Sequence, residues 1–118
     1  MRKVLVVDDY CINREYLRDC ILEYYPDTLV YESFNGEDAV EKFKAQRYDL
    51  VLLDIMMPVM DGCEALKIMK KLDSTVPVIM ATCYEAKYLE TYAQGVDGFL
   101  LKPFTPQDLI NAIEKYFS

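Results

Sequence analysis

Short apolar runs rich in β-forming residues alternate with longer segments of helical periodicity along the whole sequence. The runs are Lys3–Val7, Leu29–Ser33, Leu50–Leu53, Val76–Ala81 and Phe99–Leu101. Such alternation is typical of α/β folds, in which helices cover both faces of a parallel sheet. The third and fourth runs are continuously apolar, as expected of central strands buried on both faces. We therefore predict an α/β fold with five strands and five helices.

The segments between the runs carry helix boundaries. The first helix should end before Pro26, because the residue before a proline disfavours helix. Its apolar stripe is Ile12, Tyr16, Leu17, Cys20, Ile21 and Tyr24. The other boundaries are Asn35-Gly36 before the second helix, Asp61 with Glu64 at the third, Gly95 after the fourth (about 86–94), and Thr105 with Pro106 and Asp108 at the fifth.

Composition narrows the possible functions. The chain has 118 residues, which suits one domain over 1–118, and a net charge of −7 with scattered lysines and arginines. Without a basic patch, direct nucleic-acid binding is not expected. No run approaches the roughly 18–20 apolar residues of a membrane span, and the first residues do not resemble a signal peptide. We expect a cytoplasmic protein whose four cysteines stay reduced.

Polar side chains follow the ends of the predicted strands. Asp8 and Asp9 follow the first, Asp54 the third, Thr82 the fourth and Lys102 the fifth. Sites in such sheets form at the carboxyl ends of the strands, so these side chains should converge. Carboxylates about 4 Å apart repel by about 4 kcal/mol per pair at a dielectric constant near 20, so the cluster requires a cation or protons. Oxygen ligands suit Mg²⁺, whose coordination phosphate oxygens often complete.

These motifs, in this order, resemble the receiver domain of two-component response regulators over essentially the whole chain. The most specific stretch, DIMMPVMDG at 54–62, matches the family segment D-x-x-M-P-x-M-D-G. The stretches LVVDD at 5–9 and LKPF at 101–104 match the first and last family motifs. The resemblance implies a doubly wound (βα)5 sheet with the flavodoxin-like strand order 2-1-3-4-5 and helices on both faces.

The resemblance also implies how the acidic residues are used. Asp54 would be the phosphoacceptor, taking a phosphoryl group from a histidine kinase, a histidine phosphotransfer protein or a small acyl phosphate. Mg²⁺, which Mn²⁺ could replace, would be held by Asp8, Asp9, Asp54 and the backbone carbonyl of Met56. Such a chain is a signalling phosphoacceptor that assists its own phosphorylation and dephosphorylation, and not an enzyme in the ordinary sense.

Four further positions would respond to the phosphoryl group. Lys102 would pair with a phosphoryl oxygen, and a cis Lys102–Pro103 bond is plausible because only X-Pro bonds adopt cis at low cost. Thr82 and Phe99 would form the switch, with a plain core or surface strand aromatic as the alternative for Phe99. The readout surface would be the fourth helix, fifth strand and fifth helix, and it would contact a downstream protein or an output domain trimmed from this chain.

The sequence departs from the family pattern at several positions. Cys83 follows the switch threonine, and we hypothesise that it narrows access to the acceptor. Met56 and Tyr84 offer no acid or amide to orient a water, which predicts slow hydrolysis of the aspartyl phosphate. Asn13-Arg14 resembles receivers of phosphorelays, although Tyr10 replaces the asparagine usual there.

Three alternatives remain open from the sequence. A small phosphatase of the haloacid dehalogenase type would need D-x-D after its first strand, where this chain has adjacent aspartates. A pseudo-receiver would keep the fold and bind partners without phosphorylation. Finally, the chain could be a stand-alone regulator or the receiver of a longer one.

Overall fold

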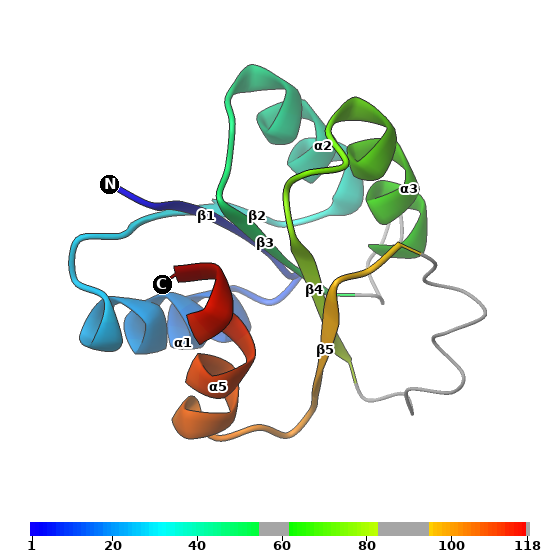
Figure 1. Ribbon diagram of the computed structural model, residues 1–118. Coiled ribbons are helices and arrows are strands. Elements are labelled where there is room, and N and C mark those ends of the chain that lie inside the picture. The colour runs from blue at the N-terminus through cyan, green and yellow to red at the C-terminus, as the bar shows by residue number, and fades with distance from the viewer. Residues whose placement is uncertain (55–61, 83–94, 118) are drawn as a thin grey trace.

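A computed structural model describes residues 1–54, 62–82 and 95–117 of the chain (Figure 1). The described elements are β1 (Lys3–Val7), α1 (Cys11–Tyr24), β2 (Leu29–Ser33), α2 (Gly36–Ala45), β3 (Leu50–Asp54), α3 (Gly62–Leu72), β4 (Val78–Thr82), β5 (Gly98–Leu101) and α5 (Pro106–Phe117). Several predictions lie outside the described residues, namely the fourth helix (86–94), the Asp61 cap, and everything assigned to Met56, Cys83 and Tyr84.

The five strands form one parallel sheet in the order β2-β1-β3-β4-β5. This confirms the predicted α/β class and strand order. Two strand boundaries differ from the prediction in a way that bears on function. β3 extends through Asp54, and β4 runs from Val78 to Thr82 instead of starting at Val76. Pro77 has no N–H to donate to a ladder, so β4 begins after it. Asp54 and Thr82 are therefore the last residues of their strands.

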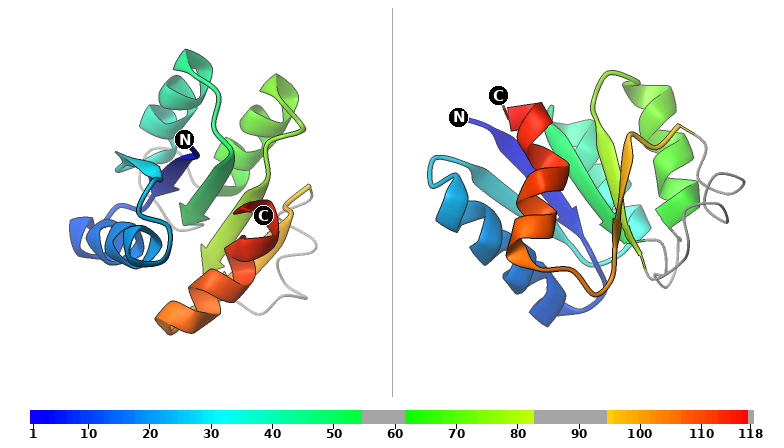
Figure 2. Two further views of the ribbon diagram at one scale, coloured as in Figure 1. Left: turned by 60° about the vertical axis from the view of Figure 1, so that its left-hand side comes forward. Right: turned by 60° about the horizontal axis from the view of Figure 1, so that its bottom comes forward.

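The helices lie in two layers, with α2 and α3 on one face of the sheet and α1 and α5 on the other (Figures 1 and 2). Successive side chains of β3 alternate between the two cores. Val51 and Leu53 pack with the α2–α3 layer, and Leu50 and Leu52 with the α1–α5 layer. Because both faces of β3 are covered, its sequence is apolar without interruption, as predicted.

Two helix starts are capped by the residues expected from the sequence. Asn35 is the N-cap of α2, and its side chain accepts a hydrogen bond from the Asp38 N–H at 2.7 Å. In α5, Thr105 Oγ1 accepts from the Asp108 N–H at 3.1 Å, and Asp108 Oδ2 accepts from the Thr105 N–H at 3.0 Å. This reciprocal pair is a capping box, which satisfies two backbone donors that the helix leaves unpaired.

The predicted stripe of α1 is only partly correct. The helix ends at Tyr24, before Pro26 as predicted, and Leu17, Cys20 and Ile21 are buried against the sheet. However, Ile12, Tyr16 and Tyr24 are exposed, at 75%, 40% and 47%. The contact of α1 with the sheet is narrower than its apolar stripe, so the flanks of the stripe face solvent.

The two ends of the chain meet at the amino edge of the sheet, as Figure 2 shows. The Arg2 guanidinium donates a hydrogen bond to the Phe117 carbonyl. Its central carbon lies 5.6 Å from the ring centroid of Tyr25 and 5.1 Å from that of Phe117. These contacts join the start of β1 to the last turn of α5. Among the helices of the described ranges, none is both long enough and apolar enough to cross a membrane.

Candidate functional site

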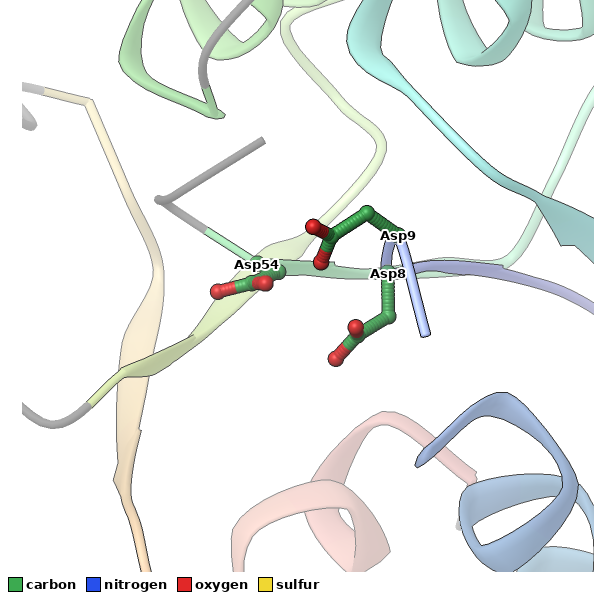
Figure 3. A group of neighbouring side chains, drawn as sticks. All are labelled: Asp8, Asp9 and Asp54. Atoms are coloured by element: carbon green, nitrogen blue, oxygen red, sulfur yellow. The ribbon is translucent and has the colours of Figure 1, made fainter. Parts of the chain in front are cut away.

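Three aspartates converge at the carboxyl edge of the sheet (Figure 3). Asp8 and Asp9 directly follow β1, and Asp54 ends β3, the strand that pairs with β1. Each residue offers one carboxylate oxygen, and these atoms all lie within 4.8 Å of one another. The parallel register of β1 and β3 brings the residues together, because neighbouring parallel strands end at the same edge.

The two adjacent aspartates differ in how their oxygens are already engaged. Asp8 is buried and accepts hydrogen bonds from the Tyr10 N–H at 3.0 Å and from Asn13 Nδ2 at 3.4 Å to each oxygen. Asp9 Oδ1 is also buried, but it has no hydrogen-bond partner among the described residues. An oxygen that is buried without a partner is costly unless a cation or a water completes it. Asp9 therefore presents the open ligand of the cluster.

Lys102 lies between two of the carboxylates. Its Nζ is 3.4 Å from Asp8 Oδ2 and 3.6 Å from Asp54 Oδ1. The residue follows β5, and its backbone N–H donates to the Thr82 carbonyl at 2.7 Å, which places the end of β5 beside the end of β4. The Lys102–Pro103 peptide bond is cis.

Among the described residues, the ammonium of Lys102 offsets only part of the charge of the three carboxylates. At a dielectric constant near 20, repulsion from two carboxylates within 4.8 Å costs Asp54 about 3.5 kcal/mol each, and Lys102 at 3.6 Å returns about 4.6 kcal/mol. These three interactions alone sum to about 2 kcal/mol of repulsion on Asp54. Three carboxylates and one ammonium carry a formal charge of −2. One divalent cation with a preference for oxygen ligands fits this charge and this donor set.

The remaining predicted site residues lie at the same edge or next to it. Thr82, the last residue of β4, is 1% exposed, and it follows Ala81, the register partner of Asp54. Phe99 on β5 is half-buried and packs against the core on the α2–α3 side of the sheet. Met56, the fourth expected metal ligand, lies outside the described residues.

A pocket of about 390 Å³ opens beside the acid cluster, between α1 and the segment after β5. Its lining residues are Asp8, Asn13, Tyr16, Leu17, Lys102, Pro103 and Phe104. The rings of Tyr16 and Phe104 lie 6.0 Å apart at its wall. The pocket thus combines an apolar wall with polar groups of the acid cluster.

Sequence reasoning did not assign a role to two residues that contact Asp8. Asn13 hydrogen-bonds its carboxylate, and Arg14 Nη1 donates to its backbone carbonyl at 2.8 Å. The sequence could have indicated the asparagine contact, because Asn13 lies in the first turn of a helix that follows a strand-end acid. The arginine contact has no such signal, because any residue type supplies a backbone carbonyl.

Comparison with known proteins agrees with this geometry. A family model described as the response regulator receiver domain matches residues 4–114. The chain is 34% identical to the chemotaxis protein CheY of Thermotoga maritima over 116 residues, which cover 97% of this chain and 96% of that protein. It is 37% identical to the transcriptional regulatory protein ResD of Bacillus subtilis, covering 92% of this chain and 45% of ResD.

A solved structure shows the same fold. The response regulator protein TrrA of Thermotoga maritima, crystallised in complex with Mg²⁺-BeF, superposes with a TM-score of 0.89 at 31% identity. The superposition covers 98% of this chain and 99% of TrrA. The likeness therefore extends over the whole sheet and both helix layers.

Proposed function

This chain belongs to the family of response regulator receiver domains, and from that premise we propose that it accepts a phosphoryl group on Asp54 in a Mg²⁺-dependent reaction. One observation carries the proposal: three strand-end aspartates each offer a carboxylate oxygen within 4.8 Å of the others, and the buried Oδ1 of Asp9 has no hydrogen-bond partner within residues 1–54, 62–82 and 95–117. We further propose that residues 1–118 act as one receiver domain in the cytoplasm.

In the proposed reaction, a carboxylate oxygen of Asp54 attacks the phosphorus of a phosphohistidine. The new O–P bond forms as the P–N bond breaks, and the electron pair of that bond leaves with the imidazole nitrogen of the donor. Asp54 is suited to this role because it ends a rigid central strand and its side chain is 9% exposed. Lys102, 3.6 Å from the nucleophile, would pair with a phosphoryl oxygen after transfer.

The metal would be held by Asp9, Asp54 and the Met56 carbonyl, with Asp8 acting at least partly through water. The different hydrogen bonding of the two aspartates supports this division, because Asp8 accepts hydrogen bonds whereas no described residue donates one to Asp9 Oδ1. When bound, Mg²⁺ would neutralise charge between the acids and the incoming phosphoryl group. Lys102 reduces the same repulsion from the other side of Asp54.

Phosphorylation would change the conformation of residues on β4 and β5. Thr82 would hydrogen-bond a phosphoryl oxygen, and Phe99 would turn inward from its half-buried position as it does so. The face built by the fourth helix, β5 and α5 would then contact a downstream protein or an output domain. The phosphoryl donor would be a histidine kinase or a histidine phosphotransfer protein.

Labelling with acetyl phosphate tests the acceptor. The wild-type protein, incubated with Mg²⁺, should gain the mass of one phosphoryl group, and excess EDTA should prevent the gain. Asp54→Asn should remain unlabelled, whereas Asp27→Asn, a change in an exposed loop, should label as the wild type does. A wild-type protein that takes no label would make the chain a pseudo-receiver, and a labelled Asp54→Asn would place the acceptor elsewhere. Phosphotransfer from a panel of kinases would then identify the partner.

A further inference from the structure

The two peptide groups that flank Asp8 are held by residues outside the acid cluster. In the Val7–Asp8 peptide, the Asp8 N–H donates to the Ser33 carbonyl on β2 at 3.1 Å. In the Asp8–Asp9 peptide, the Asp8 carbonyl accepts from Arg14 Nη1 at 2.8 Å. Because a peptide group is planar, the direction of this carbonyl also sets the direction of the Asp9 N–H and Cα. The Arg14 contact therefore fixes the angle at which Asp9 leaves the strand.

Arg14 is itself oriented by an acid on β2. Its Nε donates to Glu32 Oε1 at 3.2 Å, and its side chain is only 17% exposed. A guanidinium is planar and carries donors on several sides, so one Arg14 side chain contacts the carbonyl and the carboxylate together. Glu32 Oε2 also accepts from Arg18 Nη1 at 3.0 Å, and Arg18 has no hydrogen bond or ion pair with Asp8 among the interactions of the described residues. A continuous set of contacts thus runs from β2 through α1 to the Asp8–Asp9 peptide.

We propose that Arg14, oriented by Glu32, is a positioning residue for metal binding: it holds the Asp8–Asp9 peptide so that the Asp9 carboxylate faces Asp54. This inference rests on the proposed function, because it assigns to the acid pair the divalent cation proposed there. Arg14 would not touch the cation. Arg14 would hold Asp9 in place before the cation binds, so that binding costs less conformational entropy. Residues that orient the direct ligands of a metal affect its affinity in this way.

The sign of the effect separates positioning from charge. Arg14 is a cation near three carboxylates, so its charge alone weakens the attraction of the site for a second cation. If only charge mattered, replacing Arg14 with a neutral residue would tighten metal binding. If Arg14 positions Asp9, the same replacement loosens binding, and removal of a group that orients a ligand typically costs about 10–100-fold in affinity.

The experiment is a titration of the full chain with Mn²⁺, in which the electron paramagnetic resonance signal of the free ion gives the dissociation constant. About 0.5 M KCl is included to screen long-range charge effects. Arg14→Met should raise the dissociation constant about tenfold. Arg14→Lys should give an intermediate value, because an ammonium keeps the charge but lacks the planar fork. The matched control is Arg18→Met, which removes the other partner of Glu32 and should stay within about twofold of wild type.

Urea unfolding of each variant shows whether it is folded under the titration conditions. If Arg14→Met does not fold, Arg14→Lys decides, since it keeps the positive charge and lacks the planar fork; its dissociation constant should also rise. A folded Arg14→Met that binds Mn²⁺ as tightly as wild type, or tighter, overturns the inference, as does equal weakening in Arg18→Met or an unchanged Arg14→Lys. A wild-type protein that binds no Mn²⁺ would instead overturn the proposed function.

Discussion

At the scale of single residues, Asp8 and Asp9 are neighbours with the same side chain and different surroundings. Asp8 accepts hydrogen bonds from a backbone N–H and from Asn13, and it lies 3.4 Å from the Lys102 ammonium. The buried Oδ1 of Asp9 accepts no hydrogen bond from the part of the chain that the structure describes. A carboxylate that is already hydrogen-bonded has fewer lone pairs to offer a cation. The two residues should therefore contribute unequally to metal binding.

Substituting each aspartate by asparagine measures this inequality. Asp9→Asn should raise the dissociation constant for Mg²⁺ by at least about tenfold, or about 1.4 kcal/mol, because it removes the charge of the open ligand. Asp8→Asn should raise it less, since that carboxylate is shared with Tyr10, Asn13 and Lys102. Isothermal titration calorimetry gives both constants, with Asp27→Asn as the surface control. A larger effect at Asp8 would contradict the assignment of Asp9 as the direct ligand.

At the scale of elements, α5 begins directly after the segment that carries Lys102. Its start is fixed by the capping box between Thr105 and Asp108, and its apolar side packs on the sheet through Leu109 and Ile113. Loss of the cap leaves backbone donors of the first turn without partners. Because only two residues separate Lys102 from Thr105, the cap also anchors the chain next to the acid cluster.

Thr105→Ala should therefore lower the free energy of unfolding by about 1 kcal/mol, the usual effect of removing an N-cap hydroxyl. Urea unfolding followed by circular dichroism measures the change. Thr105→Ser is the matched control, because it keeps the hydroxyl that accepts from the Asp108 N–H. An equal loss of unfolding free energy in both variants would mean that the threonine methyl group, and not the hydrogen bond, stabilises this turn.

The helix caps and the alternation of strands were predictable from the sequence because they depend on neighbours within a few residues. The width of the contact made by α1 was not, since it depends on how much of Ile12 and Tyr16 the sheet and α5 leave uncovered. The convergence of the acids followed from the parallel topology. The inequality of Asp8 and Asp9 could not be predicted, because it arises from backbone and side-chain donors whose directions only the folded chain sets.

At the scale of the whole molecule, the acid cluster is a site of electrostatic repulsion in a fold that is otherwise stabilised by two apolar cores. Both cores are continuous apolar clusters, whereas the carboxyl edge of the sheet holds carboxylates that repel one another. At a dielectric constant near 20, the repulsion of Asp54 by Asp8 and Asp9 exceeds its attraction to Lys102 by about 2 kcal/mol. Folding should therefore be linked to the divalent-cation concentration.

Removing the charge of Asp54 tests this linkage. In EDTA, Asp54→Asn should be more stable than wild type by about 2 kcal/mol, because the net repulsion is relieved. With Mg²⁺ at about 100 times its dissociation constant, wild type should gain about 2.7 kcal/mol and Asp54→Asn less, so the difference in stability between them should narrow. Urea unfolding in EDTA and in Mg²⁺ measures the difference in unfolding free energy between the two proteins. A variant less stable than wild type in EDTA would show that the attraction of Lys102 outweighs the repulsion.

The meeting of the two chain ends at the amino edge has a practical consequence. Arg2 and Phe117 are in contact, and the aspartates lie at the other end of the same parallel strands. A fluorophore or surface anchor joined to either end is thus separated from the acid cluster by the length of the sheet. Protein immobilised in this way would present its carboxyl edge to solution, which makes tethered formats suitable for measuring its encounter with phosphoryl donors.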